Sequence, residues 1–228
     1  SGEGTYTYTL NADNTATLSK FTGTTANVPE KVTKGDDTYT VTAIGANAFA
    51  ILTSSESSPY SNNSQLTSVT LPDSISSIGQ HAFAYCVEIT SIKIPSRVTN
   101  LEKHVFSECK KLGEVTFQEG LTSIGECAFY GCKELKSISL PEGLTTVGFC
   151  AFYGANLATI DWPDSLTIVG NAAFYITDSH ARPKPIKTIT YHGTQAQWDE
   201  MASGQSFATT NPSLVPKKTE DAEGVDLH

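Results

Sequence analysis

The chain has 228 residues, of which 39% are hydrophobic and 9% aromatic, enough to bury a continuous core. Its net charge of -9 argues against nucleic acid or an anionic membrane as a partner, because phosphate binding needs a concentrated basic face. No apolar run of about 18 residues occurs, so we expect no membrane insertion by this segment. Since Ser1 and Gly2 lead almost at once into the first expected strand, we also expect that a leader has been removed.

The first elements form a predicted β-hairpin. Tyr6, Tyr8 and Leu10 alternate with polar residues, the NADNT segment supplies turn residues, and Ala16 and Leu18 resume the alternation. Because this hairpin precedes a repeat, we interpret residues 1–27 as an N-terminal cap over the first open coil.

One pattern then recurs through residues 28–191. Its phenylalanine returns at Phe83, Phe106, Phe129 and Phe152, each 23 residues after the last, and at Phe174 after a step of 22. The unit reads L-x-x-[IV]-x-[LF]-P-x-x-L-x-x-[IV]-G-x-x-A-F-x-x-C. Two inserted segments interrupt this spacing. One lies near residues 31–39 and is interpreted as a hairpin, and the other is a Ser- and Asn-rich loop at 53–64.

Each part of the unit has its own local preference. Apolar residues alternate before the proline, which predicts a short strand that ends there, and a second extended piece ends at the glycine. A-F-x-x-C places apolar groups on one face of a short helical turn. Since no unit can bury that face by itself, we expect a solenoid of about six coils, mostly short β-strands, stacked about 4.8 Å apart.

The pattern changes after Phe174. The TDSHARPKP segment is too rich in proline for regular structure, and His192-Gly193 stands where earlier coils have Leu-Pro. The following TQAQWDEM predicts a short helix with Thr194 as N-cap and Gln197 completing a capping box. Residues 192–228 are therefore interpreted as a C-terminal cap helix, with Trp198 over the last coil, and an irregular tail from about residue 211.

The unit resembles the BspA-like, or Treponema-type, leucine-rich repeat of bacterial surface proteins. The resemblance covers about residues 28–191 and depends on the repeated Ile-Gly and Ala-Phe pairs. It implies a curved leucine-rich repeat solenoid, export to the cell surface, and adhesion to a host protein or glycan. Phe117-Gln118, which lacks the proline, and Leu101-Glu102, which lacks the glycine, depart from the pattern without altering that expectation.

The five cysteines fall into two columns of the repeat. Cys86, Cys109 and Cys132 are spaced by 23, as are Cys127 and Cys150. Cysteine often fills small buried positions, and an odd count is a poor disulfide framework, so we favour reduced packing thiols. Stacked neighbours about 5 Å apart nevertheless fall within the range that a disulfide permits.

A tyrosine follows the repeated phenylalanine at Tyr130, Tyr153 and Tyr175. Helical phase points these rings away from the phenylalanines, toward solvent or the coil edge. Aligned aromatic rings can contact sugars or anchor a protein partner, so the three tyrosines are the candidate ligand-binding residues. The alternative is that they only pack on one another as an outer ladder.

The position two residues before the phenylalanine also forms a column. It contains Asn47, His81, His104, Cys127, Cys150 and Ala172. Imidazole and thiolate are zinc ligands, but tetrahedral binding needs side chains that converge and a column projects them in parallel. We therefore expect neither a metal site nor a cofactor.

Two further rows of the repeat are small and polar, as expected for solvent-facing strand positions. One contains Ser68, Ser91, Glu114, Ser137, Thr159 and Thr188, and the other Ser76, Thr99, Thr122, Thr145 and Thr167. No nucleophile elbow, zinc-protease motif or phosphate loop occurs. The sequence thus favours a non-enzymatic, secreted or cell-surface module that binds an extracellular protein or glycan. A structural spacer or assembly scaffold within a larger bacterial surface protein is the alternative.

Overall fold

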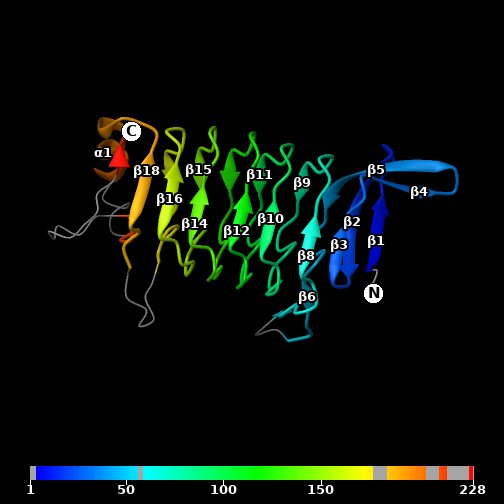
Figure 1. Cartoon of the computed structure of the whole chain (residues 1–228). Helices are drawn as coiled ribbons and strands as arrows, with labels where there is room; N and C mark the ends of the chain where they lie inside the picture. The colour runs from blue at the N-terminus through cyan, green and yellow to red at the C-terminus, as the bar shows by residue number, and fades with distance from the viewer. Residues whose placement is uncertain (1–3, 56–58, 177–183, 204–210, 215–225, 228) are drawn as a thin grey trace.

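The repeated units stack as turns of a β-solenoid, which confirms the predicted fold class (Figure 1). The computed structural model describes residues 4–55, 59–176, 184–203, 211–214 and 226–227. The short strands stand side by side along an elongated array, with the two chain termini at opposite ends (Figure 1). Among the described residues, no helix has the length and apolar character needed to cross a membrane.

One row of strands comes from the segment before the proline. It contains β3 (Thr25–Asn27), β8 (Ser68–Thr70), β10 (Ser91–Lys93), β12 (Glu114–Thr116), β14 (Ser137–Ser139), β16 (Thr159–Trp162) and β18 (Thr188–Tyr191). Paired neighbours are parallel and in repeat register, as in Ser91 opposite Glu114. The described array therefore has about seven turns. It exceeds the expected six because β3, placed in the N-terminal cap by the sequence, pairs with β8 and is the first strand of the row.

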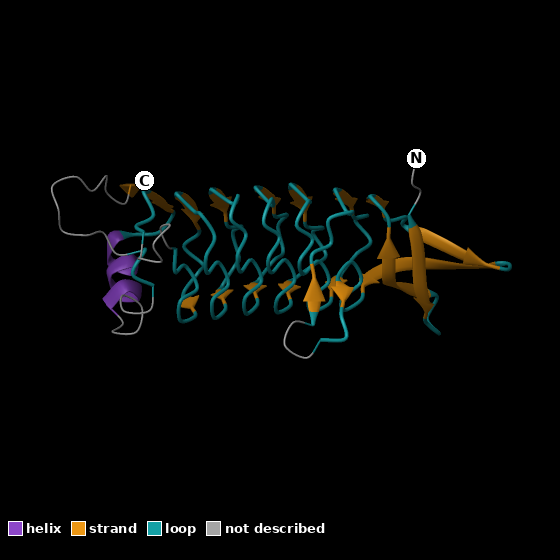
Figure 2. Ribbon diagram, turned by 90° about the horizontal axis from the view of Figure 1, so that it is seen from below, coloured by secondary structure: helices purple, strands orange, loops and turns teal. Residues whose placement is uncertain are grey.

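A second row lies on the other side of the solenoid (Figure 2). It contains the two-residue strands β9 (Ser77–Ile78), β11 (Asn100–Leu101), β13 (Ser123–Ile124), β15 (Thr146–Val147) and β17 (Ile168–Val169). Most of these strands are followed by a glycine, because the backbones of neighbouring turns approach closely there. A Cβ added at Gly125 would lie 2.6 Å from the carbonyl oxygen of Leu101 in the previous turn. A side chain there would force the two turns apart.

The A-F-x-x-C segment differs in detail from the helical turn that its apolar spacing suggests. Alternate backbone N–H groups donate to the next turn: Phe83 to the carbonyl of Val105 at 2.9 Å, and Phe106 to that of Ala128 at 2.8 Å. The amide of Cys86 instead closes a tight turn onto the carbonyl of Phe83. Bonds between turns thus satisfy groups that a helix would satisfy internally.

A column of stacked phenylalanine rings forms the centre of the core. Neighbouring ring centroids are 4.5 to 5.3 Å apart and nearly parallel through Phe49, Phe83, Phe106, Phe129, Phe152 and Phe174. Each of these rings is fully buried. The stack repeats one aromatic contact at every turn, so each turn depends on its neighbours for burial.

All five cysteines carry free thiols and are buried. The inner column adds a hydrogen bond between turns, because the Sγ of Cys109 donates to the carbonyl of Phe83 at 3.1 Å and that of Cys132 to the carbonyl of Phe106 at 3.3 Å. Burial raises the pKa of the Cys109 thiol well above its usual value. The three cysteines of this inner column, Cys86, Cys109 and Cys132, pack the core as neutral thiols.

The N-terminal end carries three hairpins. β1 (Thr5–Leu10) and β2 (Thr15–Thr22) form the predicted antiparallel hairpin, and β2 joins the array by parallel pairing with β5 (Asp37–Ile44). β4 (Lys31–Lys34) pairs antiparallel with β5, which is the hairpin expected near 31–39, and it projects from the array (Figure 1). β6 (Ile51–Leu52) and β7 (Tyr60–Ser61) make a third, small hairpin from the segment that includes the 53–64 insert.

The C-terminal end is covered by α1 (Gln195–Ser203). The predicted capping box is present: the amide of Gln197 donates to the Thr194 hydroxyl, and the amide of Thr194 donates to Oε1 of Gln197. Trp198 is buried edge-on against Trp162 of the last regular turn, with ring centroids 5.6 Å apart. The helix therefore covers the apolar end of the array.

Parts of the tail are closely packed although their backbone is irregular. Asn211 accepts a hydrogen bond from the amide of Phe174 at 2.9 Å, and Leu214 is buried. The sequence predicts an irregular tail, but the tail contains the strand β19 (Asp226–Leu227), which pairs in parallel with β18. It occupies hydrogen-bonding positions that would otherwise be an open sheet edge.

Two phenylalanines three residues apart test the role of the stack. Phe152 is fully buried between Phe129 and Phe174, whereas Phe149 is 50% exposed. We expect Phe152→Ala to lower the free energy of unfolding by about 3–5 kcal/mol. We expect Phe149→Ala to change it by less than about 1 kcal/mol. Urea unfolding followed by circular dichroism measures both, and equal losses would contradict the proposed role of the stack.

Candidate functional site

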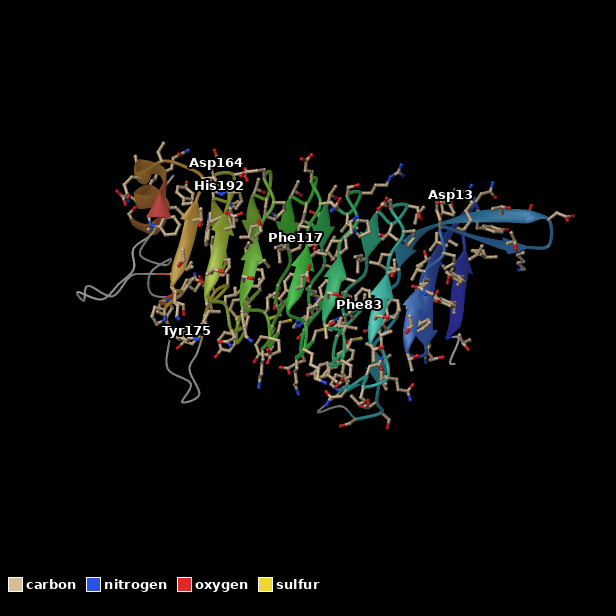
Figure 3. All side chains as sticks on the ribbon, viewed as in Figure 1. Asp13, Phe83, Phe117, Asp164, Tyr175 and His192 are labelled. Carbon is tan, nitrogen blue, oxygen red and sulfur yellow. The ribbon has the colours of Figure 1, made fainter. Side chains whose placement is uncertain are left out.

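The three predicted tyrosines form one continuous ladder. The ring centroids of Tyr130 and Tyr153 are 5.3 Å apart, as are those of Tyr153 and Tyr175, and both pairs are nearly parallel. All three side chains are half-buried, and Tyr175 lies at the lower edge of the array in Figure 3. The stacking expected from the packing interpretation is therefore present. Ligand binding by these rings stays a prediction.

The inserted hairpin β6–β7 adds further aromatic groups to the same edge. Tyr60 of β7 stacks on His81 at 5.0 Å and on Tyr85 at 5.7 Å, and His81 stacks on His104 at 4.7 Å. The Tyr60 hydroxyl donates to Oδ1 of Asn47 at 3.0 Å, which ties the hairpin to the first turns. We use the name aromatic edge for Tyr60, His81, Tyr85, His104, Tyr130, Tyr153 and Tyr175.

A hollow of ≈ 260 Å³ separates the two stacks of the aromatic edge. It is lined by Pro59, Tyr60, His81, Tyr85, His104, Ser107, Glu108, Cys127 and Tyr130. The hollow exists because Ser107 occupies the position before Tyr130 in the tyrosine column, so a small side chain stands where the ladder would continue. The ladder therefore ends at Tyr130, on the wall of the hollow.

An unusual backbone conformation directs the histidine and cysteine column toward this edge. Asn47, His81, His104, Cys127, Cys150 and Ala172 all have left-handed φ angles between 52° and 57°. This conformation costs most residues other than glycine on the order of 1 kcal/mol or more, and it persists only where its surroundings hold it. Bonds between turns supply that support, such as the amide of His104 donating to the carbonyl of Glu126 at 2.8 Å.

The groups that line the hollow are largely uncharged at neutral pH. Burial lowers the pKa of both His81 and His104, which favours the neutral imidazoles. Burial raises the pKa of the Cys127 thiol to about 11 and also raises that of the Tyr130 hydroxyl. Glu108 is the one carboxylate among the lining residues. The hollow thus offers aromatic surface and neutral hydrogen-bonding groups.

The face formed by the longer strands has a second, wider depression. A groove of ≈ 550 Å³ crosses β12, β14, β16 and β18. Its polar lining includes Ser137, Ser139, Thr159, Thr190 and Asp161, with Phe117 at its wall. Part of one polar row expected from the repeat, Glu114, Ser137 and Thr159, therefore lies in a groove rather than on a flat surface.

His192 lies above this groove, at the upper edge of the array in Figure 3. Its Nδ1 is 2.9 Å from Oε1 of Glu142, and its Nε2 is 2.6 Å from Oδ1 of Asp161. The histidine thereby connects three successive turns of the strand face. The hydrogen bond to Glu142 raises the pKa of His192 most, and the hydrogen bond to Asp161 raises it further. The sequence marks His192 only as a departure from Leu-Pro and does not reveal either partner.

Comparison with known proteins identifies the repeat. A family model described as the BspA type leucine-rich repeat region matches residues 53–181, more than half of the chain, with six copies. The chain belongs to the BspA type leucine-rich repeat family. This assignment confirms the resemblance that the Ile-Gly and Ala-Phe pairs carry.

The chain is also similar to solved structures of leucine-rich proteins from several bacteria. A leucine-rich repeat protein from Eubacterium ventriosum is 21% identical with a TM-score of 0.53, over 84% of this chain and 45% of its own length. One from Bacteroides capillosus is 29% identical with a TM-score of 0.40, over 72% and 93%. A leucine-rich cell surface protein from Faecalibacterium prausnitzii is 19% identical with a TM-score of 0.40, over 88% and 97%. No curated protein matches the chain.

The repeat explains the array but only part of the aromatic edge. Ala84 and Ser107 occupy the tyrosine column in the earlier turns, and the ladder begins only at Tyr130. Tyr60 comes from an insert and has no place in the repeat spacing, so its stacking on His81 and Tyr85 could not be predicted.

The two carboxylates around His192 make the stability of this BspA type array depend on pH. Because its folded pKa is raised, His192 contributes stability below the unfolded value of about 6.5 and loses it as pH rises through the folded pKa. We expect His192→Gln to lower the melting temperature at about pH 5.5 and to have a smaller effect at about pH 9. Thermal unfolding at both pH values measures this. An effect of equal size at both would show that the charged interaction is unimportant.

Proposed function

We propose that this chain is a non-enzymatic binding module, secreted or displayed on a bacterial cell surface, and that it binds an extracellular protein or glycan along the aromatic edge. The proposal rests on one observation, that two stacks of aromatic rings lie on either side of the same hollow. One stack contains Tyr60 from an insert, and the other begins at Tyr130 in the regular repeat. Repeat packing alone does not require that an insert place a tyrosine there.

The chemistry of the hollow suits part of a sugar or a protein side chain. Within the tyrosine ladder the ring faces cover one another, so Tyr153 offers mainly its ring edge and hydroxyl. Tyr130 ends the ladder beside the hollow, where a ring face is available for stacking. At ≈ 260 Å³ the hollow is slightly smaller than typical small-molecule sites, which favours one ring-sized group of a larger ligand.

The inserted hairpin also exposes apolar groups, which line a separate depression of ≈ 430 Å³ together with Phe21 and Ala46. Ile51 and Leu52 of β6 are 41% and 59% exposed. Clustered aromatic residues beside exposed apolar groups are typical of sites where a macromolecular partner is bound. The groove on the strand face, with its serine and threonine side chains, supplies a polar surface for further contacts.

The alternative proposal is a spacer or assembly scaffold within a larger surface protein. The elongated array, with its termini at opposite ends, favours it, because such a module separates whatever is attached to each end (Figure 1). This role requires no ligand on the aromatic edge.

An array of glycans and extracellular matrix proteins, probed with the folded chain, tests the binding proposal. We expect at least one ligand, and we expect Tyr130→Ala, Tyr153→Ala and Tyr175→Ala combined to weaken its binding by about tenfold or more. The matched control combines Thr122→Ala, Thr145→Ala and Thr167→Ala, which alters the same three turns away from the edge. The control should bind like the wild type.

Thermal unfolding of the tyrosine variant separates binding from folding. These side chains are half-buried, so a modest drop in melting temperature is expected, with a cooperative transition retained. Unchanged binding in the tyrosine variant would remove the ladder from the site. No ligand for the wild type on the array would favour the spacer.

A further inference from the structure

Three metal-binding groups converge beside the hollow, on two neighbouring turns. His104, Glu126 and Cys127 each offer one ligand atom, and these atoms all lie within 4.8 Å of one another. Among the described residues this is the one such group of three or more histidine, cysteine and carboxylate side chains. Imidazole nitrogen, thiolate sulfur and carboxylate oxygen are all established ligands of zinc.

The repeat spacing argues against a metal site because a column projects its side chains in parallel. In the structure the ligand atoms of these three residues nevertheless lie close together. His104 and Cys127 do occupy one column, with φ angles of 57° and 52°. Glu126 does not belong to that column, and its exposed side chain approaches from the position just before Cys127. The backbone bond from the amide of His104 to the carbonyl of Glu126 holds the two turns together at this point.

The surroundings orient the two more rigid groups. The ring of His104 stacks on that of His81 with an interplanar angle of 9°, so its ring nitrogens lie at the rim of a packed pair. Cys127 is only 8% exposed, which limits the movement of its sulfur. Tetrahedral zinc ligands lie roughly 3.5 Å apart, given metal bonds of about 2.0–2.3 Å. The exposed Glu126 can rotate to close the remaining gap.

We propose that His104, Glu126 and Cys127 form a binding site for a divalent transition metal of the zinc class. Three protein ligands leave a fourth position for water or for a group from outside. His104 and Cys127 both line the hollow of the aromatic edge, so that fourth position is reachable from the hollow. The metal site shares His104 with the aromatic edge, but it does not rest on the proposed function, because metal binding is measured with no protein or glycan ligand present.

Cobalt(II) is the probe that reports a cysteine ligand directly. The folded chain is titrated with Co²⁺ in the presence of a non-thiol reductant, and thiolate-to-cobalt charge-transfer absorption is recorded. We expect a band that saturates at one equivalent of metal and disappears when Zn²⁺ is added. The His192 cluster contains no sulfur, so cobalt bound there gives no such band.

Substitutions within the column give matched controls, because Asn47 shows that asparagine fits its left-handed conformation. We expect Cys127→Asn to abolish the band, and His104→Asn and Glu126→Gln each to weaken cobalt binding by about tenfold or more. Ala172→Asn, two turns beyond Cys127 in the same column, should retain the band.

Several results would overturn the assignment. The assignment is wrong if the wild type shows no charge-transfer band, if Glu126→Gln binds cobalt with unchanged affinity, or if Ala172→Asn loses the band. Glu126 is exposed, so its variant keeps the test valid even if a column variant fails to fold. Circular dichroism of each variant checks folding independently.

Discussion

The structure depends on backbone hydrogen bonds that pass from turn to turn beneath the phenylalanine stack. The amide of Phe129 donates to the carbonyl of Ala151 at 2.7 Å, and that of Phe152 to the carbonyl of Ala173 at 2.7 Å. These bonds set neighbouring turns at a spacing that lets the rings stack face to face, about 5 Å apart. Burial of each ring in turn excludes water from the bonds, so ladder and stack stabilise each other.

The same ladder builds the aromatic edge. The amide of Gly131 donates to the carbonyl of Tyr153, and that of Gly154 to the carbonyl of Tyr175, so the residues after the phenylalanines are aligned as closely as the core. The residue two positions before each phenylalanine has a left-handed backbone conformation. This conformation changes the chain direction and places imidazoles and thiols beside the tyrosine rings. The candidate binding groups therefore lie on a backbone that packing holds in place, as a preorganised site requires.

Much of this architecture could be predicted because a period of 23 residues defines neighbours. Residues one period apart must stack, which identifies the phenylalanine core, the two cysteine columns, the tyrosine ladder and both rows of strands. The capping box of Thr194 and Gln197 could also be predicted, since it is local in sequence.

Features without a period could not be predicted. Tyr60 lies in an insert, so nothing in its spacing indicates that it meets His81 and Tyr85. The approach of Glu126 to His104 and Cys127 depends on backbone direction rather than on residue type. The helical turn expected from A-F-x-x-C is replaced by tight turns, because hydrogen bonds between turns compete with those within the segment.

Amide hydrogen exchange of the whole chain, measured residue by residue, tests most directly whether the aromatic edge is a rigid surface. The ladder predicts that the amides of Phe129, Gly131, Phe152 and Gly154 exchange as slowly as those of the buried strand residues in the same turns. Exchange of these amides as fast as at Gly35 and Asp36, in the exposed turn between β4 and β5, would contradict a preorganised edge.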